Sequence, residues 1–157
     1  MKGVKVRMHT HKFLSSLLCF LSLVIASQVF AQGDAIEKRR LLMESNNDAV
    51  VKAISKAAKE GNFAEIQVKV KAIMENMDQV LDLFPKGSLS EKSRAKPEIW
   101  DKWDEFSKEP AIVKKAAQAL ADAAKTGDEA EVKTKLKALG DACASCHKNF
   151  RLPKKAS

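Results

Sequence analysis

The chain has 157 residues, of which 45% are hydrophobic and 31% are charged, which is typical of one globular domain. This composition excludes a disordered chain, a collagen-like chain and a polytopic membrane protein. The net charge of +8, from 28 basic and 20 acidic residues, would favour nucleic acid or an acidic membrane as a partner if the whole chain were the working protein.

The N-terminal segment has the pattern of a secretory leader. Basic residues without any acidic one precede an apolar run over residues 13–26, and the small residue Ala31 follows at a suitable cleavage position. The run is shorter than the roughly 20 residues that cross a bilayer as a helix, so no stable membrane anchor is predicted. Cys19 does not fit a lipoprotein site, because the residue before it is not small. We expect cleavage of residues 1–31 and a mature domain over residues 32–157 in the periplasm.

Cleavage changes the interpretation of the charge. The leader holds four basic residues and no acidic one, so its removal halves the net charge of +8. The remaining charges alternate in sign over residues 52–71 and 125–137, which is typical of solvated helix faces. A nucleic-acid partner is therefore not predicted.

The mature chain has a helical period nearly throughout. Asp34 and Glu37 resemble a capping box that opens a first helix, and Gly61 ends it. Asn62 is a good N-cap for a second helix, which Pro85 ends. The inward positions are Ile36, Arg39, Met43, Asn47, Val50, Ile54 and Ala57 in the first helix, and Phe63, Ile66, Val70, Ile73, Met77, Val80 and Phe84 in the second.

A long loop separates the second helix from the third. Residues 85–96 are rich in Ser, Lys and Gly and form this loop, and Pro97 suits the first position of the third helix. Pro110 lies inside the inward stripe of that helix, where it deletes a backbone hydrogen bond, so a kink or restart is predicted near Ser107. Gly127 ends the helix. The stripe consists of Trp100, Trp103, Phe106, Val113, Ala117, Leu120 and Ala124, which helical packing accounts for without a redox role for the tryptophans.

Asp128 can cap a fourth helix. Its inward positions are Val132, Leu136, Leu139, Cys143, Cys146 and Phe150. The connections at residues 61–62 and 127–128 are very short, and short connections make neighbouring helices antiparallel. The sequence therefore predicts an all-α fold of one domain, an antiparallel four-helix bundle in up-down-up-down order.

The chemistry of the chain is concentrated on the fourth helix. Cys143, Cys146 and His147 form a Cys-x-x-Cys-His run, in which each thiol can add to a vinyl group of haem and the imidazole can bind the iron. An exported protein could instead form a disulfide, but the adjoining histidine argues against it. A thioredoxin-like redox pair needs cysteines at the start of a helix that follows a strand, whereas these two lie near the end of the last predicted helix. A structural zinc site needs more cysteine or histidine than the mature chain contains.

Further motifs accompany this run over residues 34–152. They are Ile36-x-x-Arg39-x-x-x-Met43, Leu83-Phe84-Pro85, Ala95-Lys96-Pro97-Glu98-Ile99-Trp100 and Cys143-x-x-Cys146-His147-x-x-Phe150-Arg151. With the four predicted helices, they resemble the cytochrome c-prime family, the class II c-type cytochromes, and within it the low-spin, methionine-ligated branch. The resemblance implies one covalently attached haem c per chain.

In this family the sixth position on the iron decides the function. An open or apolar sixth position implies five-coordinate haem that binds NO or CO, whereas methionine implies low-spin haem that transfers electrons. Three methionines follow the leader: Met43, Met74 and Met77. Met74 falls off the inward stripe, and core packing explains Met77. The family motif places its iron-facing methionine four residues after the arginine that corresponds to Arg39.

We therefore expect His147 and Met43 to hold the iron, with packing in the distal pocket as the alternative role of Met43. The cation of Arg39 is costly in a plain core, but it could pair with a haem propionate. Arg151 is a second candidate for such pairing. For both, the alternative is an ordinary surface arginine. No role is assigned to Asn47.

The expected function is single-electron transfer between redox partner proteins in the periplasm, without enzymatic activity. The alternative is a gas-binding module with an open or labile sixth site. The resemblance also makes a homodimer through the first two helices compatible with the sequence. It does not identify the redox partners.

Overall fold

The computed structural model describes residues 33–154. The predicted leader, residues 1–31, lies outside the described residues. The bundle described below is the compact unit Ala35–Ser157.

The first helix of the bundle changes its winding partway along. Residues 33–48 are α-helical, η1 (Ala49–Ile54) is a π-helix, and α2 (Ser55–Lys59) returns to the α form. The hydroxyl of Ser55 donates to the carbonyl oxygen of Val50 at 2.9 Å, a five-residue separation that matches the wider π turn. The described helix already includes residue 33, so the predicted capping position lies inside the helix.

The second helix begins where the sequence predicts. Gly61 adopts a positive φ of 67°, and the Asn62 side chain then accepts the backbone N–H three residues on at 3.2 Å. This cap opens α3 (Phe63–Gln79). The α form ends earlier than predicted, because the chain tightens into a 3₁₀ turn, η2 (Leu81–Leu83), before Pro85.

The predicted third helix is divided into three pieces. They are α4 (Glu98–Asp101), α5 (Trp103–Phe106) and α6 (Glu109–Thr126). Pro110 lies in the first turn of α6, where its missing N–H has no partner to lose. The predicted restart near Ser107 is therefore confirmed.

The fourth helix is continuous. Gly127 ends α6 in the left-handed conformation at φ 75°. The Asp128 carboxylate then accepts the Glu131 N–H at 3.0 Å and caps α7 (Glu129–Phe150). Both boundaries agree with the sequence analysis.

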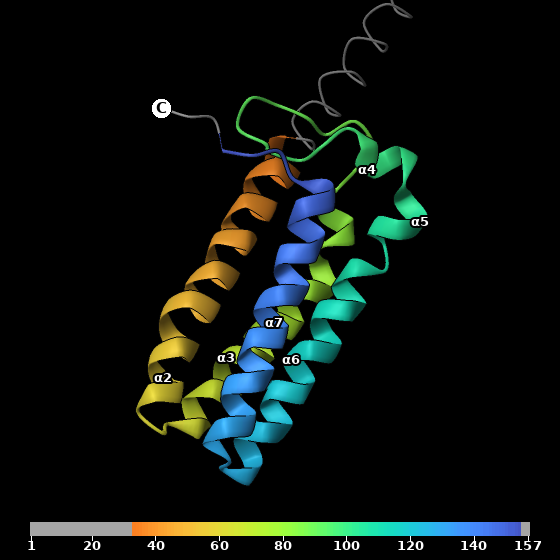
Figure 1. The fold of residues 1–157 in the computed structure, drawn as a ribbon. Coiled ribbons are helices and arrows are strands. Elements are labelled where there is room, and N and C mark those ends of the chain that lie inside the picture. Colours follow the sequence, from red (N-terminus) through yellow and green to blue (C-terminus); the bar gives the residue numbers. More distant parts are fainter. Residues whose placement is uncertain (1–32, 155–157) are drawn as a thin grey trace, which may run out of the picture. The chain divides into compact units, whose positions relative to one another are not determined.

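The long helices lie side by side and alternate in direction (Figure 1). α3 packs on α6, α6 packs on α7, and the first helix contacts α3 and α7. The fully buried large side chains include Ile54, Ile66, Val70, Ile73, Ile99, Leu120, Val132 and Leu139. Within residues 33–154 there is no strand, only an isolated bridge between Ala95 and Arg151. The predicted all-α, antiparallel up-down-up-down four-helix bundle is confirmed.

Both tryptophans pack against the core, as predicted. They are partly buried, and the indole Nε1 of Trp100 donates to the carbonyl oxygen of Phe84 at 3.1 Å. Trp103 lies beside the ring of Phe106, with ring centroids 5.6 Å apart.

No helix in the described part of the chain is long and apolar enough to span a membrane.

The inward face of the first helix differs from the prediction. Leu42 and Asn46 are buried, whereas Asn47 is exposed and Met43 is half-buried. Asn46 faces inward, where its side-chain Oδ1 accepts a hydrogen bond from the side-chain Nδ2 of Asn76 in α3 at 2.7 Å. The first helix therefore turns one edge to α3, and Met43 and Asn47 line a hollow.

Candidate functional site

The residues of the Cys-x-x-Cys-His run lie together near the end of α7. Cys143, Cys146 and His147 are separated by three and four positions, which makes them neighbours on one side of the helix. All three are half-buried, and both thiols are free. The helix therefore presents two thiols and an imidazole as one group.

Two hollows with shared walls lie beside this group. Their volumes are about 910 Å³ and about 730 Å³, at the upper end of the range for ligand pockets. Both are lined by Met43, Met77, Cys146, His147 and Arg151. Cys143 lines the smaller one. The first helix, α3 and α7 thus enclose a space with the cysteines and the histidine on one side.

The walls combine apolar side chains with unsatisfied polar atoms. Apolar lining residues of the larger hollow include Ile36, Val80, Phe84, Ile99, Phe106 and Phe150. Among the described residues, the buried Nδ2 of Asn46 and Oε2 of Glu109 have no hydrogen-bond partner, and each of these residues lines one hollow. Such atoms are rare in a finished core, so the space has the chemistry of a site for a bound group.

Burial keeps the site residues neutral. Burial, together with the positive charges of Arg151 and Arg94, lowers the pKa of His147 to about 4. Burial raises the pKa of the Cys146 thiol to about 12, with smaller contributions from Glu109 and Cys143, and it also raises the pKa of Cys143. At neutral pH the imidazole is therefore uncharged, with a lone pair available to a metal, and both sulfurs are thiols.

Arg39 has a role that sequence reasoning did not predict. It is buried, with 5% of its surface exposed, and it holds the loop after α3. Nη1 donates to the Leu83 carbonyl oxygen at 3.1 Å and to Ser88 Oγ at 2.7 Å, and Nη2 donates to the Ser88 carbonyl oxygen at 2.5 Å and to Ser93 Oγ at 2.6 Å. The guanidinium lies 4.6 Å from the centroid of the Phe84 ring. Arg39 lines the larger hollow, but the expected propionate pairing would compete with these four bonds.

Arg151 is better placed for an anionic group. It follows α7, its N–H donates to the His147 carbonyl oxygen at 3.0 Å, and its side chain lines both hollows. Arg94 also lines both hollows and was missed by the sequence analysis. Its only sequence signal is its position directly before the motif over residues 95–100. The bridge between Ala95 and Arg151 brings these two arginines to the same opening.

The three methionines occupy different environments. Met43 and Met77 line both hollows. Met77 is buried in the core, while Met43 is half-buried. Met74 lines neither hollow and packs against the core. Met43 and Met77 are therefore the two methionines that line the same hollows as His147.

Comparison with known proteins relates this geometry to a family. The sequence profile described as "Cytochrome C'" matches residues 34–151. Cytochrome c-556 of Agrobacterium fabrum is 33% identical over 153 residues, which cover 96% of this chain and 99% of that protein. Cytochrome c' of Pararhodospirillum photometricum is 36% identical over 120 residues, 74% of this chain and 94% of that protein.

Solved structures agree with the sequence comparison. A cytochrome c' described as having an unusual ligand-controlled dimer dissociation superposes with a TM-score of 0.70 at 27% identity, over 78% of this chain and 97% of that chain. Cytochrome c' from Thermochromatium tepidum superposes with a TM-score of 0.66 at 27% identity, over 76% of this chain and 96% of that chain. The chain therefore belongs to the cytochrome c' family and binds haem c covalently.

Proposed function

We propose that the chain is a periplasmic monohaem electron carrier in which His147 and Met43 are the axial ligands of the iron. The observation that carries this proposal is that a neutral imidazole from α7 and a thioether from the first helix line the same cavity. The leader pattern of residues 1–31 supports export to the compartment where c-type haem proteins work.

The residues present fit covalently held haem. Cys143 and Cys146 are free thiols beside the cavity, and each can form a thioether by adding its S–H across one vinyl group. His147 directly follows the second cysteine, so it lies beside the place where the porphyrin is tethered. The bound haem supplies one-electron exchange between Fe(III) and Fe(II). The chain's residues bind it, exclude water and set its potential.

Exposure and core packing favour Met43 over Met77 as the sixth ligand. Met77 is 7% exposed and packs with the core residues of α3, so its contacts are already made. Met43 is half-buried, and its thioether is left with an unfilled side at the cavity wall. A thioether opposite imidazole raises the reduction potential, which suits an electron carrier.

Arg94 and Arg151 are the proposed partners of the propionates. They come from two segments that are joined by the Ala95–Arg151 bridge, and both line the two hollows. Bidentate guanidinium groups match carboxylates well. Arg39 would contribute indirectly, by holding the loop that carries Arg94.

The absorption spectrum of the purified holoprotein tests the ligand assignment. We expect low-spin ferric haem with a far-red methionine-to-iron band, and Met43→Ala should abolish that band and lower the potential. Met77→Ala is the matched control and should retain the band. If Met77→Ala loses the band instead, the assignment is wrong while the function remains.

The same spectrum separates electron transfer from gas binding. A high-spin wild-type spectrum with rapid uptake of CO would contradict methionine ligation and establish the open-site alternative. Export is tested separately by cell fractionation: the haem-containing chain should appear in the periplasmic fraction, and deletion of residues 2–31 should leave it in the cytoplasm without covalent haem.

A further inference from the structure

We propose that a basic rim around the cavity docks an acidic protein surface on the redox partner. The basic rim consists of Lys92, Arg94, Lys148, Arg151 and Lys154, all of which line one or both hollows. This inference rests on the proposed electron-transfer function. The proposal concerns the surface of the protein through which electrons are exchanged with the partner.

The rim carries a surplus of positive charge. In the described part of the chain none of its five side chains is within ion-pair distance of a carboxylate, whereas the ion pairs there lie elsewhere. Burial lowers the pKa of Arg151, and the like charge of Arg94 lowers it further. The two propionates of haem can offset two positive charges, so the rim keeps a net positive charge after loading.

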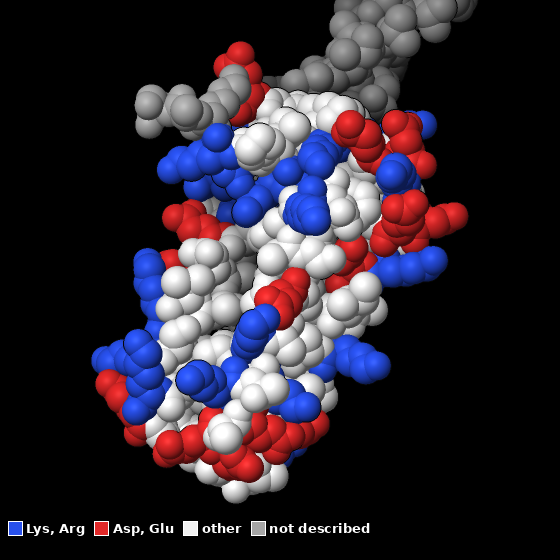
Figure 2. All heavy atoms as spheres, viewed as in Figure 1, with Lys and Arg blue, Asp and Glu red and all other residues white. Residues whose placement is uncertain are grey.

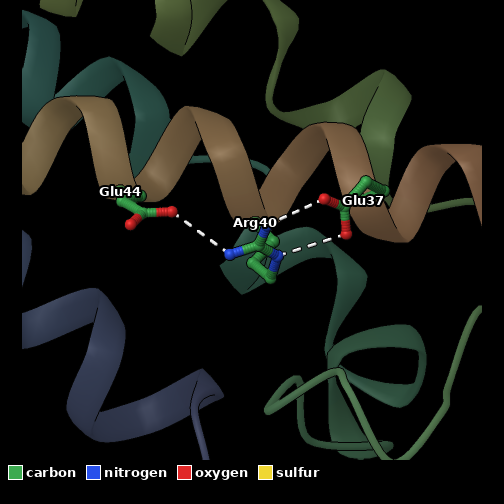
Figure 3. A network of polar contacts seen from close by, with 3 residues as sticks. All are labelled: Glu37, Arg40 and Glu44. Atoms are coloured by element: carbon green, nitrogen blue, oxygen red, sulfur yellow. Dashed lines mark hydrogen bonds and ion pairs between the residues drawn. The ribbon is translucent and has the colours of Figure 1, made fainter.

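Neighbouring carboxylates do not neutralise the rim. Glu37 lies near Lys92, but its two oxygens accept from the Arg40 guanidinium at 2.7 and 3.2 Å. The other side of Arg40 is paired with Glu44 at 3.1 Å. Figure 3 shows Arg40 between these two carboxylates. This network keeps a net charge of −1, because one guanidinium faces two carboxylates, so it can offset at most one of the five positive charges of the rim.

The rim is built as one surface from two segments. The Leu152 N–H donates to the Arg94 carbonyl oxygen at 2.7 Å, and the Lys96 N–H donates to the Phe150 carbonyl oxygen at 3.0 Å. The Lys96 ammonium also donates to the carbonyl oxygens of Lys148 and Asn149 at the end of α7. The loop before α4 is thereby fixed to the tail of α7.

An apolar residue lies among these charges. Leu152 lines the smaller hollow and is 43% exposed. An apolar centre with a charged surround is the usual composition of a protein interface. The rim and Leu152 together therefore provide both contact area and electrostatic orientation.

The charge pattern favours a protein over a membrane. Basic side chains gather over the upper part of the face in Figure 2, where α7 ends, and acidic ones gather beside α4 and α5. The short helices α4 and α5 carry Glu98, Asp101, Asp104 and Glu105. A flat anionic bilayer would be repelled by this acidic neighbour, whereas a protein can match a change of sign.

Two double variants of the holoprotein test the proposal. Lys92→Glu/Lys148→Glu reverses charge on the rim. Lys59→Glu/Lys133→Glu makes the same change in net charge at the other end of the bundle, since Lys133 lies about 20 Å from His147 along α7. All four lysines are exposed, so both variants should fold. The absorption spectrum of each is recorded first.

The kinetic probes are ferricyanide and tris(phenanthroline)cobalt(III), which each take one electron from the ferrous protein. The rim variant should react roughly threefold to tenfold more slowly with the anionic oxidant at low salt, and faster with the cationic one. The difference should vanish at high salt, and the control variant should differ from wild type by less than about twofold. Equal rates for the two double variants would overturn the proposal.

A binding measurement provides a readout apart from redox rates. The oxidised holoprotein should bind poly-L-glutamate in calorimetry at low salt, and the rim variant should lose this binding while the control keeps it. Sedimentation with phosphatidylglycerol vesicles tests whether the rim binds an anionic membrane instead of a protein. Binding to vesicles that depends on the rim, without binding to polyglutamate, would overturn the choice of a protein partner.

Failure of this proposal is distinguishable from failure of the proposed function. A rim variant with the wild-type spectrum and unchanged rates overturns the docking surface and leaves methionine ligation intact. A high-spin wild-type spectrum overturns methionine ligation whatever the salt dependence of the rates.

Discussion

Arg39 combines a buried charge with neutral partners. Burial lowers the pKa of its guanidinium, and no carboxylate is paired with it among the described residues. The cost of burying the charge is offset by four hydrogen bonds to the loop and by the face of the Phe84 ring. Ser88 is fully buried, and both its hydroxyl oxygen and its carbonyl oxygen accept from Arg39.

We expect Arg39→Gln to destabilise the holoprotein by about 2–4 kcal/mol, because it leaves Ser88 without its charged donor. Urea unfolding measures this loss. Arg39→Lys should give an intermediate loss, since one ammonium cannot reproduce the planar fork. Arg40→Gln, in the exposed network of Figure 3, should have little effect. Equal losses for Arg39→Gln and Arg40→Gln would contradict the anchoring role.

Glu109 makes stability depend on pH. Burial raises the pKa of its carboxyl above 4.5, so the folded chain holds this proton at pH values where the unfolded chain has released it. Stability contributed by this group therefore falls as pH rises from 4.5 through the folded pKa. Glu109→Gln should increase the free energy of unfolding at pH 7 by up to about 1 kcal/mol and should have no such effect at pH 4. Equal gains at both pH values would contradict this explanation.

At the scale of elements, local signals predicted the helix ends well. Asn62, Gly127 and Asp128 act within one turn of the chain, so residue type alone was informative. The restart at Pro110 was equally local. The π-helix η1 was missed. The inward turn of Asn46 was also missed, because it depends on the hydrogen bond from Asn76 in α3. The loop contacts of Arg39 were missed for the same reason.

The cap of α7 can be tested because its bond is isolated on the surface. Asp128→Ala should cost about 1 kcal/mol, since it removes the acceptor for the Glu131 N–H. Asp128→Asn keeps an acceptor oxygen and should cost less. Thermal unfolding of the holoprotein measures both. A loss that is the same for both variants would indicate a charge effect at the helix terminus instead of the hydrogen bond.

At the scale of the bundle, the cavity lies beside the core, between the helices. α6 packs along both α3 and α7, and the η1 and α2 parts of the first helix contact α3 and α7. The haem-attachment motif could be placed from the sequence, but its cavity could not, because its walls come from every helix of the bundle. We therefore expect haem to contact several helices at once and to stabilise the bundle.

Bound haem is expected to stabilise the fold as well as to carry the electron. It would cover apolar side chains that line the larger hollow, among them Val80, Phe84 and Phe106, and burial of apolar surface contributes about 25 cal/mol per Å². We expect Cys143→Ala/Cys146→Ala to lack covalent haem on a denaturing gel and to unfold at lower urea.

Hydrogen exchange locates the change in that variant. Amides of residues 36–47 should lose protection first, while those of residues 114–126 in α6 and of the N-terminal half of α7 should keep more of theirs, since α6 packs on α7 and these parts do not line the cavity. Cys143→Ala retains Cys146 and should keep both haem and protection through one thioether. Uniform loss of protection over all four helices in the double variant would show that haem stabilises the whole bundle cooperatively rather than the first helix alone.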